Sequence, residues 1–178
     1  MSQIQIEESE KDKDERVTKE MFQKTQLLDL LILMLITLGT AFCTASYNLE
    51  FEGNYGFNTH SFLLMNMAFS ITCCLFIVMR ENLYLRMSKN RGTAKATDNL
   101  ASTGRIKIIL IECLLVVVHP YPFFVGDKLI YYNEAVGMHI YYHVNDFFQL
   151  FSLVRFVYFL TSILNISVWR SRSSYRIW

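Results

Sequence analysis

Apolar residues in this chain gather in four long blocks that are separated by short polar links. The blocks cover residues 26–47, 58–79, 106–124 and 144–169. Blocks of about 20 residues match the thickness of a bilayer's hydrocarbon core, whereas a soluble domain of this size would show its apolar residues in periodic stripes. The pattern therefore predicts an all-α, multi-pass membrane protein with a four-helix transmembrane bundle that resembles a voltage-sensor-like domain.

The segments on either side of the blocks are polar. Residues 1–25 mix acids and bases with few apolar side chains, which predicts a mobile cytosolic arm with at most a helical turn leading into the membrane. This charge is incompatible with a cleavable signal peptide. The expected organisation is a charged arm over 1–25, a transmembrane domain over 26–169, and the start of a basic linker over 170–178.

The distribution of Lys and Arg predicts the orientation in the membrane. The arm, the link over 80–107 and the tail carry 5, 7 and 3 of these residues, and the links over 48–57 and 125–143 carry 0 and 1. Cytosolic segments carry the excess of Lys and Arg, so both termini are expected in the cytosol. Four spans, an even number, also require both termini to lie on the same side of the membrane. The expected location is the plasma membrane.

Composition excludes several classes of function. The formal net charge is only +1, so charge gives no reason to expect a nucleic-acid partner. No nucleotide-binding loop, Ser-His-Asp grouping or pair of nearby carboxylates is present, so we expect neither enzymatic activity nor a cofactor. The four cysteines all lie inside apolar blocks and are expected to be small packed side chains rather than disulfide or zinc ligands; they are Cys43, Cys73, Cys74 and Cys113.

Arg155 lies in the middle of the fourth block, where an unpaired charge costs several kcal/mol. Glu112 in the third block is the expected partner, and we interpret the pair as a contact that holds the helices together rather than a substrate site. Asp29 and Asp146 are further candidate counter-charges. Asn66 in the second block is expected to hydrogen-bond to another helix, and small residues between Gly39 and Ser46 are expected to allow close helix packing.

Voltage sensing needs more charge than Arg155 supplies. Steep gating takes about 3–4 charges per subunit, usually as an arginine at every third position. The corresponding positions here are Ser152, Tyr158 and Thr161, so no arginine ladder is present. The sequence therefore predicts weak voltage dependence at most.

His139, His143 and Asp146 could form a metal site if the chain is helical from Met138 onward, because spacings of four and three residues share one helix face. The alternative is an aromatic and histidine belt at the membrane interface, since four tyrosines surround these residues. We favour the interfacial belt and predict no metal.

Residues Glu112-Cys113-Leu114, His119-Pro120 and Pro122 resemble the third helix of small-conductance calcium-activated potassium channels. The fourth block with its single Arg155, followed by the basic, serine-rich segment from Arg170 to Arg176, is similar to that family's fourth helix and following linker. The basic residues of this segment are Arg170, Arg172 and Arg176. The resemblance covers about residues 105–176, and the first two blocks match only in hydropathy and placement.

The resemblance implies a six-span subunit in a tetrameric potassium channel that is gated by bound calmodulin and depends weakly on voltage. The sequence departs from the family pattern in three ways. It contains neither a Thr-Val-Gly-Tyr-Gly filter nor a calmodulin-binding segment. In addition, Thr161 stands where the family has a second arginine.

Two hypotheses follow for the function. The chain is the peripheral membrane domain of a calcium-activated potassium channel subunit, either as part of a longer chain or as a poreless relative that joins homo- or hetero-tetramers in the lipid bilayer. Alternatively, it is a four-span structural or assembly protein without transport activity.

Overall fold

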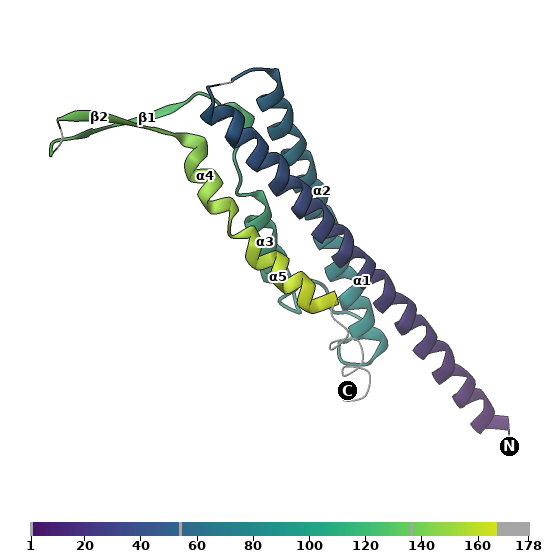
Figure 1. Ribbon diagram of the computed structural model, residues 1–178. Coiled ribbons are helices and arrows are strands. Elements are labelled where there is room, and N and C mark those ends of the chain that lie inside the picture. Colours follow the sequence, from purple (N-terminus) through teal and green to yellow (C-terminus); the bar gives the residue numbers. More distant parts are fainter. Residues whose placement is uncertain (1, 54, 136, 167–178) are drawn as a thin grey trace.

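The computed structural model describes residues 2–53, 55–135 and 137–166 and shows a mostly helical protein with one β-hairpin (Figure 1). Three of its helices are long and apolar enough to cross a membrane, over Arg16–Phe51, Phe57–Asn90 and Arg105–Phe124. The elements in chain order are α1 (Ser2–Phe51), α2 (Phe57–Asn90), α3 (Arg105–Val117), the 3-10 helix η1 (Pro122–Phe124), β1 (Lys128–Asn133), β2 (Met138–His143), α4 (Val144–Ser152) and α5 (Arg155–Ile166).

The first two predicted spans lie inside longer helices. Residues 26–47 belong to α1 and residues 58–79 to α2, and each helix continues past its apolar block. The helix of α1 already begins at Ser2, so residues 2–25 are helical where the sequence analysis expected a mobile arm. This segment is rich in Glu, Lys and Gln, which are strong helix formers even without apolar partners.

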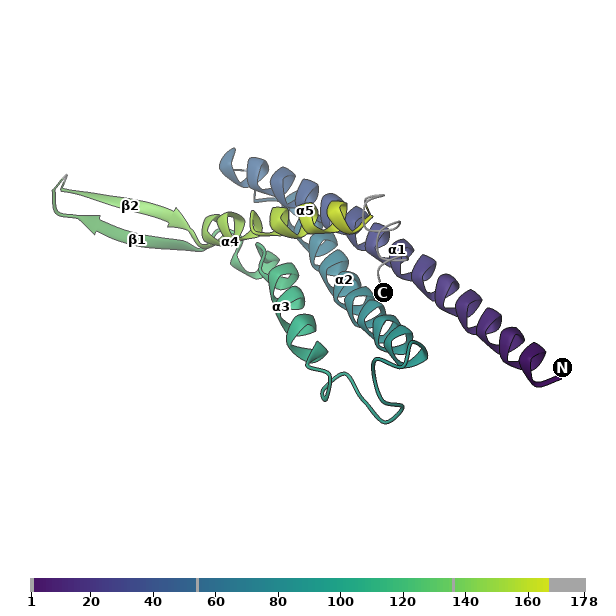
Figure 2. The ribbon, with the colours of Figure 1, turned by 90° about the horizontal axis from the view of Figure 1, so that it is seen from below.

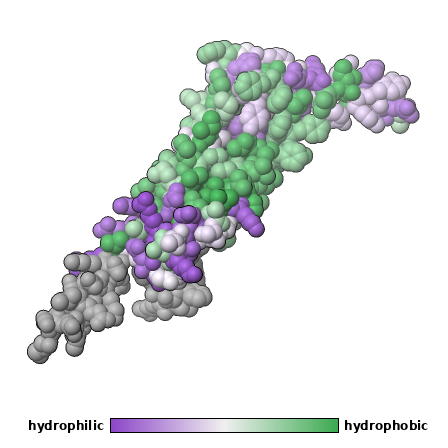
Figure 3. Space-filling model, turned by 180° about the vertical axis from the view of Figure 1, so that it is seen from behind, coloured by the Kyte–Doolittle hydropathy of each residue, from purple (hydrophilic) through white to green (hydrophobic). Residues whose placement is uncertain are grey.

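Helices α1 and α2 run antiparallel side by side, α3 packs against α2, and α5 lies along α1 (Figures 1 and 2). On the face seen in Figure 3, apolar residues cover the middle of the helices and polar residues lie toward either end, as expected of a bilayer-spanning surface. The buried core between α1, α2 and α3 consists of Ile32, Ile36, Cys73, Ile77 and Val116. All four cysteines are free thiols; Cys43 and Cys73 are buried, and Cys74 and Cys113 are half-buried.

Helix α3 ends at Val117, shortly before Pro120 and Pro122. The helix thus ends seven residues before the end of the predicted span over 106–124, because proline has no backbone N–H and restricts the residue before it. Residues 118–121 leave the helical conformation, and a short turn of 3-10 helix follows at Pro122.

The link after η1 forms an antiparallel hairpin of β1 and β2, in which Lys128 pairs with His143 and Asn133 with Met138. Residues 138–143 are therefore a strand, so His139 does not share a helix face with His143 and Asp146, as the metal alternative required. Each strand has one isoleucine and two tyrosines at its centre, which favour strands, and Gly137 in the turn has φ +65°, which suits glycine. The hairpin projects sideways from the end of the helices (Figures 1 and 2).

The fourth apolar block begins at Val144 as predicted but is divided into α4 and α5. Between them the backbone makes i to i+3 hydrogen bonds of 2.9–3.2 Å, from Leu153 N to Leu150 O through Val157 N to Val154 O. This pattern is a turn of 3-10 helix, which is tighter than an α-helix and often marks a hinge or strain. The end of the predicted span and the basic linker over 170–178 lie outside the described residues.

Candidate functional site

Two arginines are almost fully buried among apolar helices, where a charged side chain is costly and usually tied to function. Arg80 of α2 is 4% exposed and Arg155 at the start of α5 is 2% exposed. The two side chains have different surroundings: acidic groups contact Arg80, whereas uncharged groups contact Arg155.

Arg80 lies at the centre of a group of five charged residues from α1, α2 and α3, which we call the Arg80 cluster. Its Nη1 donates to Asp29 Oδ1 at 3.1 Å, and its Nη2 donates to Glu81 Oε1 at 3.0 Å and to Glu112 Oε2. Arg105 extends the cluster, since its Nη1 donates to Glu81 Oε2 at 2.9 Å. The members are Asp29, Arg80, Glu81, Arg105 and Glu112.

The Arg80 cluster joins three helices through one guanidinium. Asp29 and Glu81 are 3% exposed, so their charges depend on the arginines instead of water. Arg105 is more accessible and also stacks over the ring of Tyr84, 5.6 Å from its centroid. Removal of one member of a buried ion pair leaves the other charge uncompensated, so the cluster is a strong constraint on the relative position of these helices.

The structure corrects the predicted partner of Glu112. We expected an ion pair between Glu112 and Arg155, but Glu112 contacts Arg80, and Arg155 contacts α2 and the end of α3. The reason is depth in the membrane. Asp29, Arg80 and Glu112 lie at the start, end and start of consecutive antiparallel spans and so share one side, whereas Arg155 lies further in.

The guanidinium of Arg155 is held by three neutral acceptors. Nη1 donates to Asn66 Oδ1 at 3.0 Å, and Nη2 donates to Ser70 Oγ at 2.9 Å and to the carbonyl of Val116. Asn66 and Ser70 lie on α2, one turn apart, and Val116 lies in the last turn of α3. The contact between Asn66 and α5 confirms that this buried amide makes a helix-to-helix hydrogen bond.

Pro120 explains why the Val116 carbonyl is available. In a continuing α-helix the carbonyl of residue 116 would accept the N–H of residue 120, but proline has none. The C-terminal end of a helix also carries partial negative charge, which favours a cation. The proline that ends α3 thus creates an acceptor for Arg155.

Gly39 of α1 provides the space for this arrangement. A Cβ atom at position 39 would lie 2.8 Å from Asn66 Oδ1 and 3.5 Å from Arg155 Nη1. No real side chain tolerates the first distance without movement, so the close approach of α1 to α2 at this point requires glycine. This agrees with the prediction that the small residues from Gly39 to Ser46 allow close packing.

Part of the Arg155 site has no protein partner. Arg155 Nε and Asn66 Nδ2 are buried and make no hydrogen bond within the described part of the chain. A recess of about 290 Å³ between α1 and the α4–α5 segment adjoins Arg155 and is lined by Thr37, Thr40, Gln149 and Arg155, among others. The site therefore places a positive charge next to a partly polar opening.

Asp146 does not act as a counter-charge for Arg155. It accepts the N–H of His143 at 3.2 Å through Oδ2 and so caps the N-terminus of α4. His143 Nδ1 lies 3.6 Å from Glu50 Oε1, and Glu50 also accepts from Asn145 Nδ2 at 3.4 Å. His139 contacts the ring of Tyr132 in the hairpin. The described residues contain no group of three or more residues suited to a metal.

The family-motif residues take mainly structural positions. Cys113 packs against the core, Pro122 is buried at the start of η1, and His119 Nδ1 lies 2.7 Å from the carbonyl of Pro120. His119 is 1% exposed and stacks near Tyr121, with ring centroids 4.4 Å apart. The remaining motif residues, Arg170, Arg172 and Arg176, lie outside the described residues.

Sequence reasoning missed Arg80 and Glu81, which it assigned to a basic link rather than a span. A usable signal was present. Because consecutive spans alternate in direction, charges at the start of one span and the end of the next lie at the same depth, and this rule selects Arg80 for Asp29 and Glu112.

A double-mutant cycle tests the corrected pairing. We expect Arg80→Gln with Glu112→Gln to show a coupling of about 1–3 kcal/mol, because the two groups are in contact. Glu112→Gln with Arg155→Gln should be additive within about 0.5 kcal/mol, because they share no hydrogen bond. The free energy of unfolding is measured by titration of SDS into mixed micelles. Equal coupling in both cycles would contradict the assignment.

Replacement of Gly39 tests the close approach at Arg155. Gly39→Ala should destabilise the chain by about 1–3 kcal/mol, because the new Cβ displaces the Asn66 amide that holds Arg155. In an Asn66→Ala background the same change should become neutral or stabilising, since alanine favours helix over glycine by up to about 1 kcal/mol. The same SDS titration measures the free energy of unfolding in both backgrounds. An unchanged penalty in the second background would show that the obstacle is not Asn66.

Comparison of the chain with protein-family models, with curated proteins and with solved structures finds no match. The similarity to small-conductance calcium-activated potassium channels therefore rests on the sequence motifs around Glu112 and Arg155. It stays a prediction, and the geometry of the two arginines is the basis on which a function can be proposed.

Proposed function

We propose that the chain is the peripheral transmembrane domain of a calcium-activated, weakly voltage-dependent potassium channel subunit. It would contribute to potassium transport together with a pore that the 178 residues do not contain. The observation that carries this proposal is the single arginine of the fourth apolar block, buried among neutral acceptors from α2 and α3. Such a charge is a fixed part of the domain rather than one step of a moving ladder.

In this proposal the domain is a four-helix bundle with both termini in the cytosol. The fourth helix consists of α4 and α5, joined by the 3-10 turn at Leu153 and Val154. The Lys and Arg of the link over 80–107 and of the N-terminal segment lie on the cytosolic side. The hairpin of β1 and β2 then projects at the opposite side of the membrane.

The outer side of α4 and α5 supports an association with further membrane helices. Five exposed aliphatic residues follow one another at spacings of three and four along α4 and α5. We call them the outer stripe, and each is 47–67% exposed: Leu150, Leu153, Val157, Leu160 and Leu164. A tetramer around a shared pore would cover this stripe. Calmodulin is a partner by family resemblance only, through a segment outside this chain.

The second candidate is a four-span structural or assembly protein without transport activity. The Arg80 cluster favours it, because buried ion pairs that join α1, α2 and α3 would stabilise any bundle, whatever its role. The two candidates differ in whether the domain can work with a potassium pore.

A chimera tests this. The first four spans of a small-conductance calcium-activated potassium channel are replaced by residues 1–169, and currents are recorded by patch clamp at controlled internal calcium. We expect a calcium-activated potassium current without steep voltage activation, because one charge is well below the 3–4 per subunit that steep gating takes. The 178-residue chain alone should give no potassium current.

The outer stripe supplies matched controls for the chimera. Leu153→Asn with Leu160→Asn should abolish the current, whereas Leu110→Asn with Leu114→Asn on the exposed side of α3 should preserve most of it. Surface labelling shows whether each protein reaches the membrane. A chimera that reaches the surface and stays silent would contradict the channel proposal and favour the assembly protein.

A further inference from the structure

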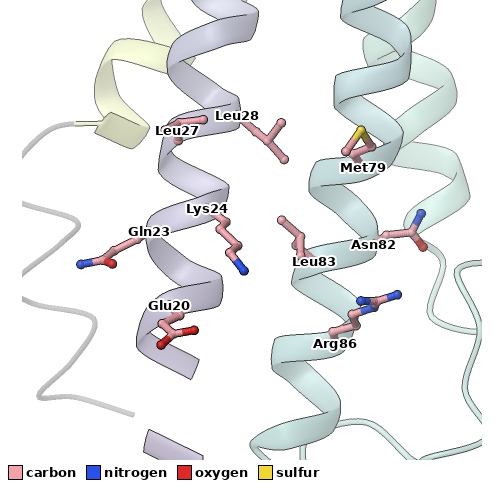
Figure 4. A pocket seen from close by; sticks show the side chains of 9 residues that line it. All are labelled: Glu20, Gln23, Lys24, Leu27, Leu28, Met79, Asn82, Leu83 and Arg86. Atoms are coloured by element: carbon pink, nitrogen blue, oxygen red, sulfur yellow. The ribbon is translucent and has the colours of Figure 1, made fainter. Parts of the chain in front are cut away.

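A groove lies between α1 and α2 at the end of the helices where the apolar segments pass into charged ones (Figure 4). Its volume is about 770 Å³, within the range of sites that enclose ligands larger than a simple ion. Its lining comes only from the two helices: Glu20, Gln23, Lys24, Leu27, Leu28, Met79, Asn82, Leu83 and Arg86.

The lining changes character along the helix axis. Leu27, Leu28 and Met79 form the end nearer the middle of the membrane, and Leu83 continues the apolar wall (Figure 4). Beyond them Lys24 of α1 and Arg86 of α2 both line the groove, with Glu20 further out (Figure 4). The groove thus combines an apolar trough with a polar mouth.

The two cations at the mouth are exposed and unpaired. Within the described residues neither Lys24 nor Arg86 joins an ion pair, whereas Arg80 and Arg105, further inside, both do. With Glu20 included, the mouth carries a net charge of one positive unit. An anionic group between Lys24 and Arg86 would complete the charge balance.

We propose that this groove binds an anionic phospholipid of the same leaflet. The phosphate lies between Lys24 and Arg86, and one acyl chain lies along Leu27, Leu28 and Met79. A free anion would use the mouth only and leave the apolar trough uncovered, whereas a lipid matches both. Basic openings between membrane helices on the cytosolic side are a recurrent arrangement for acidic headgroups. This site goes beyond the proposed function and does not depend on it.

A binding measurement tests the proposal. The full chain in a nonionic detergent is titrated against phosphatidylglycerol and phosphatidylcholine that carry the same fluorophore on one acyl chain, and anisotropy reports binding. We expect phosphatidylglycerol to bind at least about tenfold more tightly. Lys24→Gln and Arg86→Gln should each lower its affinity about fivefold, as expected for one cation near an acidic headgroup. Neither change should alter phosphatidylcholine binding.

Three further variants separate the alternatives. Glu20→Gln should raise the affinity for phosphatidylglycerol, because it removes the one negative charge at the mouth. Leu83→Trp, which fills the trough, should weaken the binding of both lipids. Arg91→Gln with Lys107→Gln removes two exposed cations on the same side that do not line the groove, and should change the affinity less than about twofold. Circular dichroism in the same detergent verifies folding.

Three results would overturn the proposal. Equal affinity for the two lipids would exclude headgroup recognition. An equal loss in the Arg91→Gln, Lys107→Gln control would reduce the effect to general surface charge. Displacement of the labelled lipid by excess inorganic phosphate would identify an anion site that needs no acyl chain.

Discussion

A guanidinium inside the hydrocarbon layer must find acceptors for its N–H groups within the protein, and this requirement explains much of the structure around Arg155. α2 supplies Asn66 and Ser70, and α3 supplies the Val116 carbonyl that Pro120 leaves free. Gly39 of α1 has no side chain and so leaves room for these contacts. Features that seem unrelated in the sequence thus serve one side chain, and they bring the helices together at one point.

The two buried arginines differ in what they can do in an electric field. In the Arg80 cluster each guanidinium is paired with carboxylates, whereas Arg155 keeps a whole charge among dipoles. Moving one charge across the entire membrane yields about 2.3 kcal/mol per 100 mV. Hydrogen bonds to a charged group contribute about 1.5–3 kcal/mol each, and Arg155 makes three. These three hydrogen bonds together exceed the work that 100 mV does on one charge, so they favour a fixed position for Arg155.

Sequence reasoning succeeded where the pattern along the chain determines the structure, and it failed where contacts between segments distant in the chain determine it. Hydropathy located the first two apolar blocks within α1 and α2, whereas α3 ends at Val117, before the expected end of the third block at residue 124. The hairpin was missed because His139 and His143 fit a helical spacing, although the β-branched and aromatic residues around them favour strands. The partner of Glu112 was missed because the arginine in the middle of the fourth block was chosen over Arg80 at the end of a span. Of these two arginines, only Arg80 lies at the same depth as Glu112.

The Arg80 cluster also bears on the groove next to it. With three carboxylates and two guanidiniums it carries a net negative charge, which opposes an anion nearby. Lys24 precedes Asp29 by five residues, about 7–8 Å along the helix. At that separation and an effective dielectric constant of about 20, one unit charge repels another by about 2 kcal/mol. A cation at about 4 Å attracts by about 4 kcal/mol, and the mouth offers two, Lys24 and Arg86. The electrostatic attraction of the phosphate exceeds its repulsion even when Glu20 adds a second repulsive charge, because the attractive groups lie nearer to the phosphate.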